Sequence, residues 1–274
     1  MKRLYMLFLI LITFGIGEMM NAQTKYCRYE YNNSVNYGIV KGKTIYNLNK
    51  APWIGGVQTG EKVEIDKVKL LCPGEPPVIL GLGKSYKQSW EGKIPPKTVR
   101  WFIKPTSSAG NPNENIVLPQ SLNAVKVEVE LIIVIGKKIK NATPEEAKNA
   151  IFGYSVGNDI VGDKYSYLKI NGETPESAGG LLGSGLKIGD GFEPFGPFII
   201  TNINWKNRTK KLTVFKTDGS VKTDYTENTS DLIYQPEKIV SDLSRVLTLQ
   251  PGDLVTISIN GIGKFSNKIV KTQR

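Results

Sequence analysis

Residues 127–136 read VEVELIIVIG, a run that alternates apolar and acidic residues and then becomes wholly apolar. This pattern predicts a β-strand, and residues two apart on a strand point to the same face. Glu128 and Glu130 therefore project together, and two neighbouring carboxylates repel each other unless a cation lies between them. The pattern alone fits both an ordinary strand with a solvated charged face and a carboxylate pair that binds a cation, and the ordinary strand is the simpler interpretation.

The residues that follow this strand predict a helix and then a second strand. Thr143 is a good N-cap, Pro144 suits the first helical position, and Glu146 completes a capping box. We expect this helix to run through Phe152 and to lead into an apolar strand. Asp159, near the end of that strand, can approach the glutamate pair.

The rest of the chain is rich in short strand-like segments and turns. One further helix is expected over residues 235–247, where apolar residues gather on one side. Many strands with two helices predict a β-dominated α+β fold. The predicted organisation is a signal peptide at 1–22, a small N-terminal β domain at 23–73 and a larger domain at 74–274. Residues 172–191 are dense in glycine and predict a mobile loop.

The first 22 residues have the pattern of a secretory signal. Lys2 and Arg3 precede an almost uninterrupted apolar run from Leu4 to Gly17, and Ala22 offers a small residue before a cut ahead of Gln23. The run is short for a transmembrane helix, although an uncleaved N-terminal anchor is the alternative. We therefore expect an exported protein, periplasmic or secreted, with no membrane association after cleavage.

Charge and composition narrow the chemistry. The formal net charge is +11, and removal of residues 1–22 leaves +10. Because the basic residues are scattered, we expect attraction for small anions rather than nucleic acid binding. The chain contains no histidine, which excludes His-ligated zinc and Ser-His-Asp catalysis. A metal would need oxygen ligands, which suit Mg²⁺, Mn²⁺ or Ca²⁺.

Cys27 and Cys72 are the two cysteines. Export would permit a disulfide between them. Their apolar, strand-like surroundings fit two buried free thiols equally well.

Residues 127–160, VEVELIIVIGKKIKNATPEEAKNAIFGYSVGNDI, closely resemble the core of fumarylacetoacetate hydrolase family proteins. Further blocks match in the same order: YGIV at 37–40, ILGLGKSY at 79–86, WFIKPTSS at 101–108, NTSDLI at 228–233 and LQPGD at 249–253. The resemblance covers nearly the whole chain after residue 22, and the shared order of the blocks carries it.

The resemblance implies a fold, a site and partners. The fold would be a mixed β-roll or sandwich catalytic domain with a small N-terminal β domain, commonly assembled as a homodimer. Glu128, Glu130 and Asp159 would be metal ligands, with Mg²⁺ the first expectation and Mn²⁺ or Ca²⁺ the alternatives. Lys187 falls where the family places a lysine that contacts substrate, although a solvated loop lysine is the other interpretation. The substrate would be a small 2-oxo or 1,3-diketo carboxylate.

Parts of the family's catalytic pattern are changed. The histidine of its lid segment falls on Ser89, and the lid glutamate falls on Gly92, with Glu91 one residue away as a candidate catalytic carboxylate. Asp163 and Ser166 stand where the family has Arg and Gln. The substrate loop expected between residues 249 and 263 is deleted.

Two functions fit these residues. One is a divalent-metal-dependent enzyme that hydrolyses a C–C bond, decarboxylates or tautomerises a small oxo acid, with Lys187 and Glu91 as candidate catalytic residues. The other is a catalytically inactive relative that binds a ligand or has a structural role outside the cytoplasm.

Overall fold

A computed structural model describes residues 23–122, 124–172, 174, 184–216, 218–257 and 264–271. The predicted signal peptide lies outside the described residues, as do half of the glycine-dense segment 172–191 and residues 258–263, near the predicted loop deletion. In the described part of the chain, no helix is both long and apolar enough to cross a membrane.

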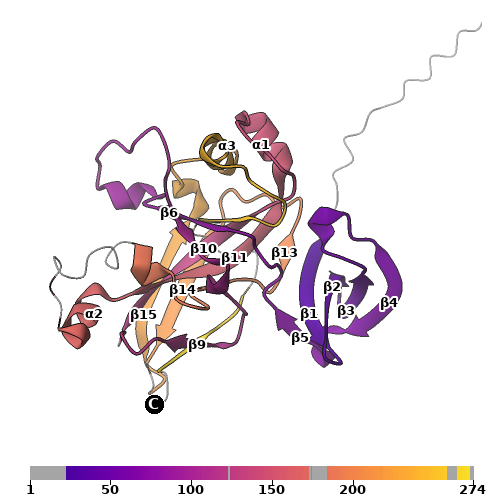
Figure 1. Ribbon diagram of the computed structural model, residues 1–274, viewed down its shortest axis with the longest axis horizontal. Coiled ribbons are helices and arrows are strands. Elements are labelled where there is room, and N and C mark those ends of the chain that lie inside the picture. The colour runs from indigo at the N-terminus through magenta and orange to yellow at the C-terminus, as the bar shows by residue number, and fades with distance from the viewer. Residues whose placement is uncertain are drawn as a thin grey trace, which may run out of the picture.

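The chain is β-dominated, which confirms the predicted α+β class (Figure 1). The helices are α1 (Pro144–Ala150), α2 (Lys164–Asn171) and α3 (Pro236–Val246). The strands of the first half are β1 (Lys25–Tyr31), β2 (Ser34–Lys41), β3 (Thr44–Leu48), β4 (Gln58–Glu64), β5 (Lys69–Leu71), β6 (Ile79–Gly83), β7 (Arg100–Lys104), β8 (Ala109–Gly110) and β9 (Asn115–Leu118). The later strands are β10 (Val125–Ile135), β11 (Ile151–Gly162), β12 (Glu193–Pro194), β13 (Ile199–Ile200), β14 (Thr209–Phe215), β15 (Val221–Asn228), β16 (Leu254–Ile257) and β17 (Lys268–Lys271).

Eleven strands of the described chain share one sheet, in the order β4-β3-β2-β1-β13-β11-β10-β16-β6-β7, with β5 paired to β1. The long strands β10 and β11 are antiparallel and lie side by side near its middle. β10 contains residues 127–135 of the predicted strand and begins two residues earlier, at Val125. Its apolar half is buried on both faces, because Leu131 and Ile133 pack on one side while Ile132 and Val134 pack on the other.

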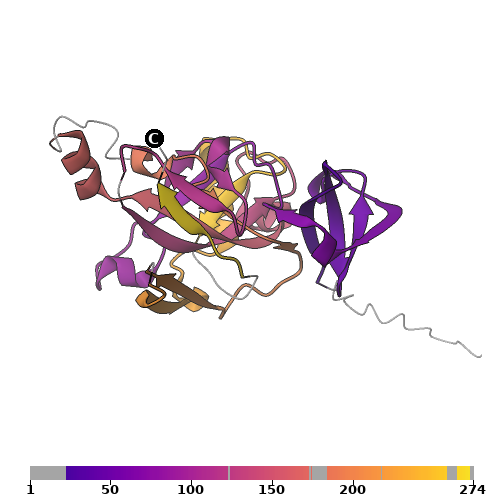
Figure 2. The same ribbon diagram turned by 90° about the horizontal axis from the view of Figure 1, so that it is seen from below.

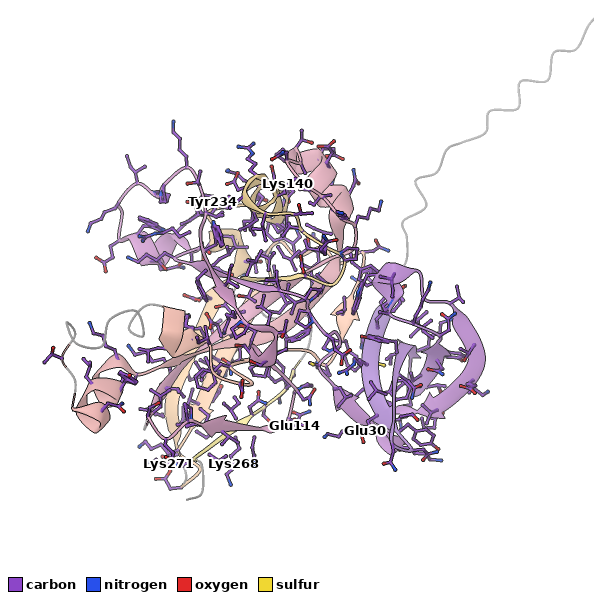
Figure 3. The ribbon with its side chains drawn as sticks, in the orientation of Figure 1. Glu30, Glu114, Lys140, Tyr234, Lys268 and Lys271 are labelled. Atoms are coloured by element: carbon purple, nitrogen blue, oxygen red, sulfur yellow. The ribbon has the colours of Figure 1, made fainter. Side chains whose placement is uncertain are left out.

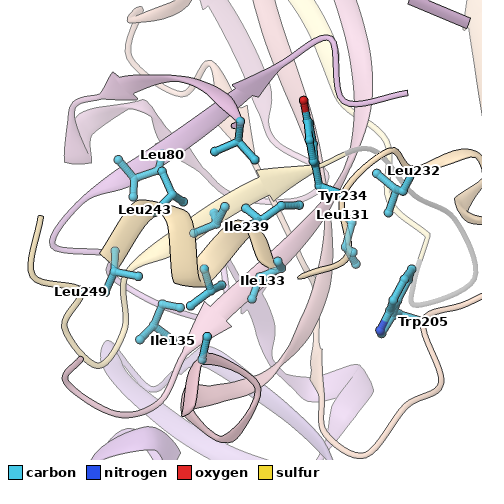
Figure 4. Packing of buried hydrophobic residues seen from close by; sticks show 14 of the residues in the cluster. Leu80, Leu131, Ile133, Ile135, Trp205, Leu232, Tyr234, Ile239, Leu243 and Leu249 are labelled. Atoms are coloured by element: carbon cyan, nitrogen blue, oxygen red, sulfur yellow. The ribbon is translucent and has the colours of Figure 1, made fainter. Parts of the chain in front are cut away.

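The helix α3 covers one face of this sheet (Figure 4). Ile239 and Leu243 of α3 are fully buried in one cluster with Leu131, Ile133 and Leu80 of the strands below. Burial of such side chains contributes about 1.5–3 kcal/mol each. The opposite face of β10 is apolar at Ile132 and Val134 and carries polar side chains in the first half of the strand.

Two of the three α-helices in the described residues were expected from the sequence, but α1 ends at Ala150 rather than at the predicted Phe152, because Ile151 and Phe152 begin β11. At α1, the Thr143 hydroxyl accepts a hydrogen bond from the Glu146 backbone N–H at 3.3 Å, and the Glu146 carboxylate accepts one from the Thr143 N–H at 2.8 Å, as the capping box predicts. The predicted second helix is α3. The sequence analysis missed α2, whose residues show no clear apolar periodicity.

The N-terminal strands form a lobe beside the rest of the molecule (Figures 1 and 2). β1 nevertheless pairs with β13, so hydrogen bonding continues from the lobe into the main sheet. Trp53 of the lobe contacts Phe152 edge-on, with ring centroids 6.0 Å apart. Lys69 of β5 also pairs with Glu114 at 2.6 Å, and Figure 3 labels Glu114 on the side of the main part that faces the lobe.

Cys27 and Cys72 are buried free thiols. Cys27 packs with Tyr29 and Ile45, whereas Cys72 packs in a different cluster with Ile79. Burial raises the pKa of Cys27 to about 12 and that of Cys72 to about 11. The sequence left open a disulfide or two buried free thiols, and the structure has the two free thiols.

Candidate metal centre

The antiparallel register of β10 and β11 brings three carboxylates together. Glu128 lies directly opposite Asp159, and Glu130 lies opposite Gly157. Because side chains alternate along a strand, all three carboxylates project from the face of β10 that α3 does not cover. One oxygen from each of Glu128, Glu130 and Asp159 lies within 4.8 Å of the others.

Exposure falls along this group of carboxylates. The Glu128 side chain is 48% exposed, whereas Glu130 is 8% and Asp159 is 2% exposed. Like charges directly opposite each other on paired strands are destabilising. Three neighbouring carboxylates, two of them buried, therefore need positive charge nearby.

Lys187 supplies part of that charge from the short 3₁₀ turn η6 (Ser184–Lys187). Its ammonium donates to Glu128 Oε2 at 3.1 Å and to Asp159 Oδ2, and it lies 5.1 Å from the centre of the Phe102 ring. Burial alone would lower the pKa of Lys187, but the carboxylates of Asp159 and Glu128 outweigh it and hold that pKa well above its ordinary value. Lys187 is thus an ammonium and a hydrogen-bond donor at neutral pH.

Because Gly81 has no side chain, the Phe102 ring can occupy the space next to the Lys187 ammonium. The two residues are cross-strand partners in β6 and β7. A Cβ at Gly81 would lie 2.2 Å from the nearest atom of the Phe102 ring, which a real structure does not tolerate. A larger residue at this position would displace the ring.

Lys104 approaches the same aspartate from inside the protein. Its side chain is fully buried, and its ammonium donates to Asp159 Oδ1 at 2.7 Å, to Glu193 Oε2 at 2.7 Å and to the Phe192 carbonyl at 2.9 Å. Burial lowers the pKa of Lys104, but Glu193 and Asp159 more than reverse this and raise it. All three N–H groups of the Lys104 ammonium therefore have hydrogen-bond partners.

The sequence analysis did not select Lys104 or Glu193. Glu193 is fully buried, and burial raises the pKa of its carboxyl to about 7 although Lys104 acts to lower it. The one sequence feature that could have pointed to these two residues is a charged residue within an apolar segment. Lys104 follows Ile103 at the end of a strand, and Glu193 interrupts the run Phe192-Glu193-Pro194-Phe195.

Glu91 and Ser89 lie in or next to the 3₁₀ turn η3 (Lys87–Trp90). Glu91 ends this turn in a left-handed conformation and is exposed. The turn is attached to the segment around Asp231, whose carboxylate accepts a hydrogen bond from Gln88 at 3.2 Å. No ion pair or hydrogen bond found in the described residues joins Glu91 to the three carboxylates.

Asp163 lies directly before α2. Its backbone N–H donates to the Ala124 carbonyl, and its own carbonyl accepts from Tyr167. The residue thus lies where β11 passes into α2.

The donor set suits a hard divalent cation. Three carboxylates from two rigid strands can offer oxygen ligands at one position, and the chain has no histidine to add a nitrogen ligand. Asp159 is oriented by Lys104 through one oxygen, so its other oxygen faces Glu128. We call Glu128, Glu130 and Asp159 the carboxylate triad.

A model of the fumarylacetoacetate hydrolase C-terminal domain matches residues 79–270, and a model of an Rv2993c-like N-terminal region matches residues 24–73. The chain belongs to the fumarylacetoacetate hydrolase family. The match includes both strands of the carboxylate triad, as well as Lys104, Lys187 and Glu193. Members of this family use divalent metals and include isomerases, tautomerases, decarboxylases and hydrolases that act on small organic acids.

Curated relatives and solved structures place the chain within the family. It is 32% identical to a fumarylacetoacetate hydrolase domain-containing protein 2 homolog of Dictyostelium discoideum, over 74% of this chain and 66% of that protein. It is 31% identical to oxaloacetate tautomerase fahd2 of Xenopus laevis, over 72% of this chain and 60% of that protein. The crystal structure of 2-hydroxyhepta-2,4-diene-1,7-dioate isomerase from Mycobacterium marinum superposes with a TM-score of 0.71 at 27% identity, over 92% of this chain and all of that one.

Proposed function

We propose that this protein is a divalent-metal-dependent enzyme that tautomerises or decarboxylates a small 2-oxo acid. The observation that carries the proposal is the carboxylate triad with the Lys187 ammonium against two of its members. Mg²⁺ is the first expectation for the metal, since the triad offers only oxygen ligands. Similarity to an oxaloacetate tautomerase and to a diene-dioate isomerase supports this choice of chemistry.

Tautomerisation and decarboxylation of a 2-oxo acid share one requirement. In each reaction negative charge develops on the 2-oxo oxygen, and a divalent cation bound to the triad would act there as a Lewis acid. Lys187 would donate a hydrogen bond to the same oxygen, because its raised pKa keeps it protonated. The rigid pairing of β10 with β11 fixes the triad before the substrate binds.

Hydrolysis of a C–C bond has a further requirement, which is a base that activates water. The chain has no histidine, and Ser89 cannot accept a proton near neutral pH. Glu91 is exposed at the end of η3, with no recorded bond to the triad in the described residues. These observations favour decarboxylation over hydrolysis, because loss of carbon dioxide needs no activated water; tautomerisation also transfers a proton, which solvent water would have to carry.

The direct test is turnover of oxaloacetate with Mg²⁺ or Mn²⁺. Enol–keto conversion is followed by ultraviolet absorbance and decarboxylation by release of carbon dioxide. We expect metal-dependent turnover that Glu130→Ala abolishes. Turnover unaffected by a chelator, or equal rates for Glu130→Ala and wild type, would contradict the proposal.

The same assays address the inactive alternative, which the replacements at Ser89 and Asp163 favour. A protein that binds Mg²⁺ and oxalate in calorimetry but turns over neither oxaloacetate nor acylpyruvates would be a binding protein. Export and a homodimeric state are also proposals, supported by the pattern of residues 1–22 and by family resemblance. Detection in the cytoplasm with residues 1–22 intact, or a monomeric mass in light scattering, would contradict them.

A further inference from the structure

Glu193 is a buried acidic group for which the proposed reaction has no direct use. Its side chain is fully buried on β12, so it cannot touch a substrate. One carboxylate oxygen accepts a hydrogen bond from Lys104, while no bond to the other, Oε1, is found among the described residues. An incompletely paired carboxylate in a protein interior is unfavourable. Its presence beside the triad therefore requires an explanation.

The backbone around Glu193 is arranged to accommodate the carboxylate. Gly157 lies opposite Glu130 in the β10–β11 ladder, and a Cβ at Gly157 would lie 3.2 Å from Glu193 Oε1. The backbone carbonyl of Phe192, the residue before Glu193, accepts hydrogen bonds from both the Lys104 ammonium and the Ile160 backbone N–H. The position of the Glu193 side chain is thus fixed relative to both strands that carry the triad.

The charges of this region depend on Glu193. Lys104 lies 2.7 Å from both Asp159 and Glu193, so its single positive charge is shared by two carboxylates. Without Glu193, Lys104 would neutralise Asp159 and weaken the attraction of that ligand for a cation. With Glu193 ionised, the four carboxylates and two ammonium groups leave two net negative charges, which match a divalent cation.

We propose that Glu193 is a positioning residue that sets the charge of the metal centre: it balances Lys104, so that Lys104 can orient Asp159 without cancelling its charge. The inference rests on the proposed function, because it assumes that the triad binds a divalent cation. It assigns Glu193 and Lys104 a joint role in affinity for the metal, separate from any contact with substrate.

The test is the Mn²⁺ dissociation constant of the intact protein, measured by calorimetry at about pH 8, above the pKa expected for Glu193. Glu193→Gln keeps the shape and removes the charge, and we expect it to weaken Mn²⁺ binding by about 10–100-fold. Glu193→Asp retains the charge and should bind more tightly than Glu193→Gln. The matched control is Asp253→Asn, another carboxylate that is 2% exposed but belongs to the turn before β16; its affinity should stay within about twofold of wild type.

Two further measurements separate charge from packing. Replacing Mn²⁺ by a trivalent lanthanide should enlarge the loss in Glu193→Gln, because the electrostatic attraction scales with the charge of the cation. The double variant Lys104→Met/Glu193→Gln restores the net charge and should bind Mn²⁺ more tightly than Glu193→Gln, which also covers the case in which that single variant folds poorly. Circular dichroism reports the folding of each variant.

The outcomes are distinguishable. Tight Mn²⁺ binding by wild type that Glu193→Gln leaves within twofold would overturn this inference alone. Failure of the double variant to exceed Glu193→Gln would also overturn it. If wild type itself binds no Mn²⁺, the proposed function fails as well.

Discussion

Lys104 and Lys187 donate to opposite oxygens of Asp159, one from inside the protein and the other from the side of the half-exposed Glu128. Lys104 is fully buried with Glu193, and we call these two residues with Asp159 the inner half of the centre. Lys187 and Glu128 form the outer half, with side chains 20% and 48% exposed. Water can solvate the outer half when a partner is lost, whereas nothing replaces a partner in the inner half. We therefore expect the Lys104–Asp159 contact to be structural and the Lys187–Asp159 contact to be available for chemistry.

The largest expected effect is on stability, from Lys104→Met. This change leaves Glu193 buried without its cation and should lower the free energy of unfolding by about 3–5 kcal/mol. Urea denaturation measures it. Lys187→Met removes an equal charge from the outer half and should cost about 1 kcal/mol or less. Equal losses in the two variants would contradict the distinction between the halves.

A double variant sharpens the same comparison. Lys104→Met/Glu193→Leu removes both the cation and one carboxylate, so that Asp159 keeps Lys187 as its partner. Replacing a buried ion pair by apolar residues is often neutral or stabilising. We expect the double variant to regain most of the stability that Lys104→Met loses. A loss as large as that of the single variant would show that packing, rather than unpaired charge, decides the effect.

The second effect is on catalysis and is expected at Lys187 of the outer half. Removing a donor that stabilises developing negative charge typically costs 10²–10³ in kcat. Lys187→Met should therefore lose activity toward oxaloacetate by roughly that factor while it unfolds near the wild-type urea midpoint. Steady-state kinetics with Mg²⁺ would measure it. Wild-type kcat in this variant would remove Lys187 from the proposed reaction.

A smaller effect concerns pH and belongs to the inner half. Because burial raises the pKa of Glu193 from 4.5 to about 7, the folded protein holds this proton more tightly than the unfolded chain does. This contribution to stability is fully present below the unfolded pKa, and it is lost as pH rises from about 4.5 to 7. In metal-free protein, Glu193→Gln should gain stability relative to wild type across that window. A difference between the two that does not vary with pH would contradict the assignment.

The smallest effect is expected at Glu91, which belongs to neither half. The residue is exposed at the end of η3. If tautomerisation or decarboxylation needs no lid base, Glu91→Gln should change kcat/KM by less than about twofold, within the range of ordinary surface substitutions. A loss of 10²-fold or more would instead assign Glu91 a general-base role and favour hydrolysis.

The sequence pointed to the carboxylate triad and Lys187, but not to Lys104 or Glu193. Alternation along one strand predicts that Glu128 and Glu130 lie on the same face, and family resemblance adds Asp159. The strand at β10 and the cap of α1 follow from local sequence patterns that need no tertiary information. The interpretation of Lys187 as a lysine at the substrate site remains a prediction, although its ammonium does lie against the triad.

Lys104 and Glu193 could not be found in the same way. They are 89 residues apart in the chain, and only the packing of β7 and β12 around β11 brings them together. A lysine at the end of a strand is normally solvated, so its sequence gives no hint of complete burial. The helix α2 was missed for a related reason, because its residues lack the apolar period on which a helix prediction depends.

The carboxylate triad is the central claim, and manganese can locate it directly. Crystals soaked with Mn²⁺ and measured near the manganese absorption edge should show one strong anomalous peak within ligand distance of Glu128, Glu130 and Asp159, and Asp159→Asn should lose that peak. A peak elsewhere with none at the triad, or a peak that persists unchanged in Asp159→Asn, would contradict the assignment of these residues as the metal centre.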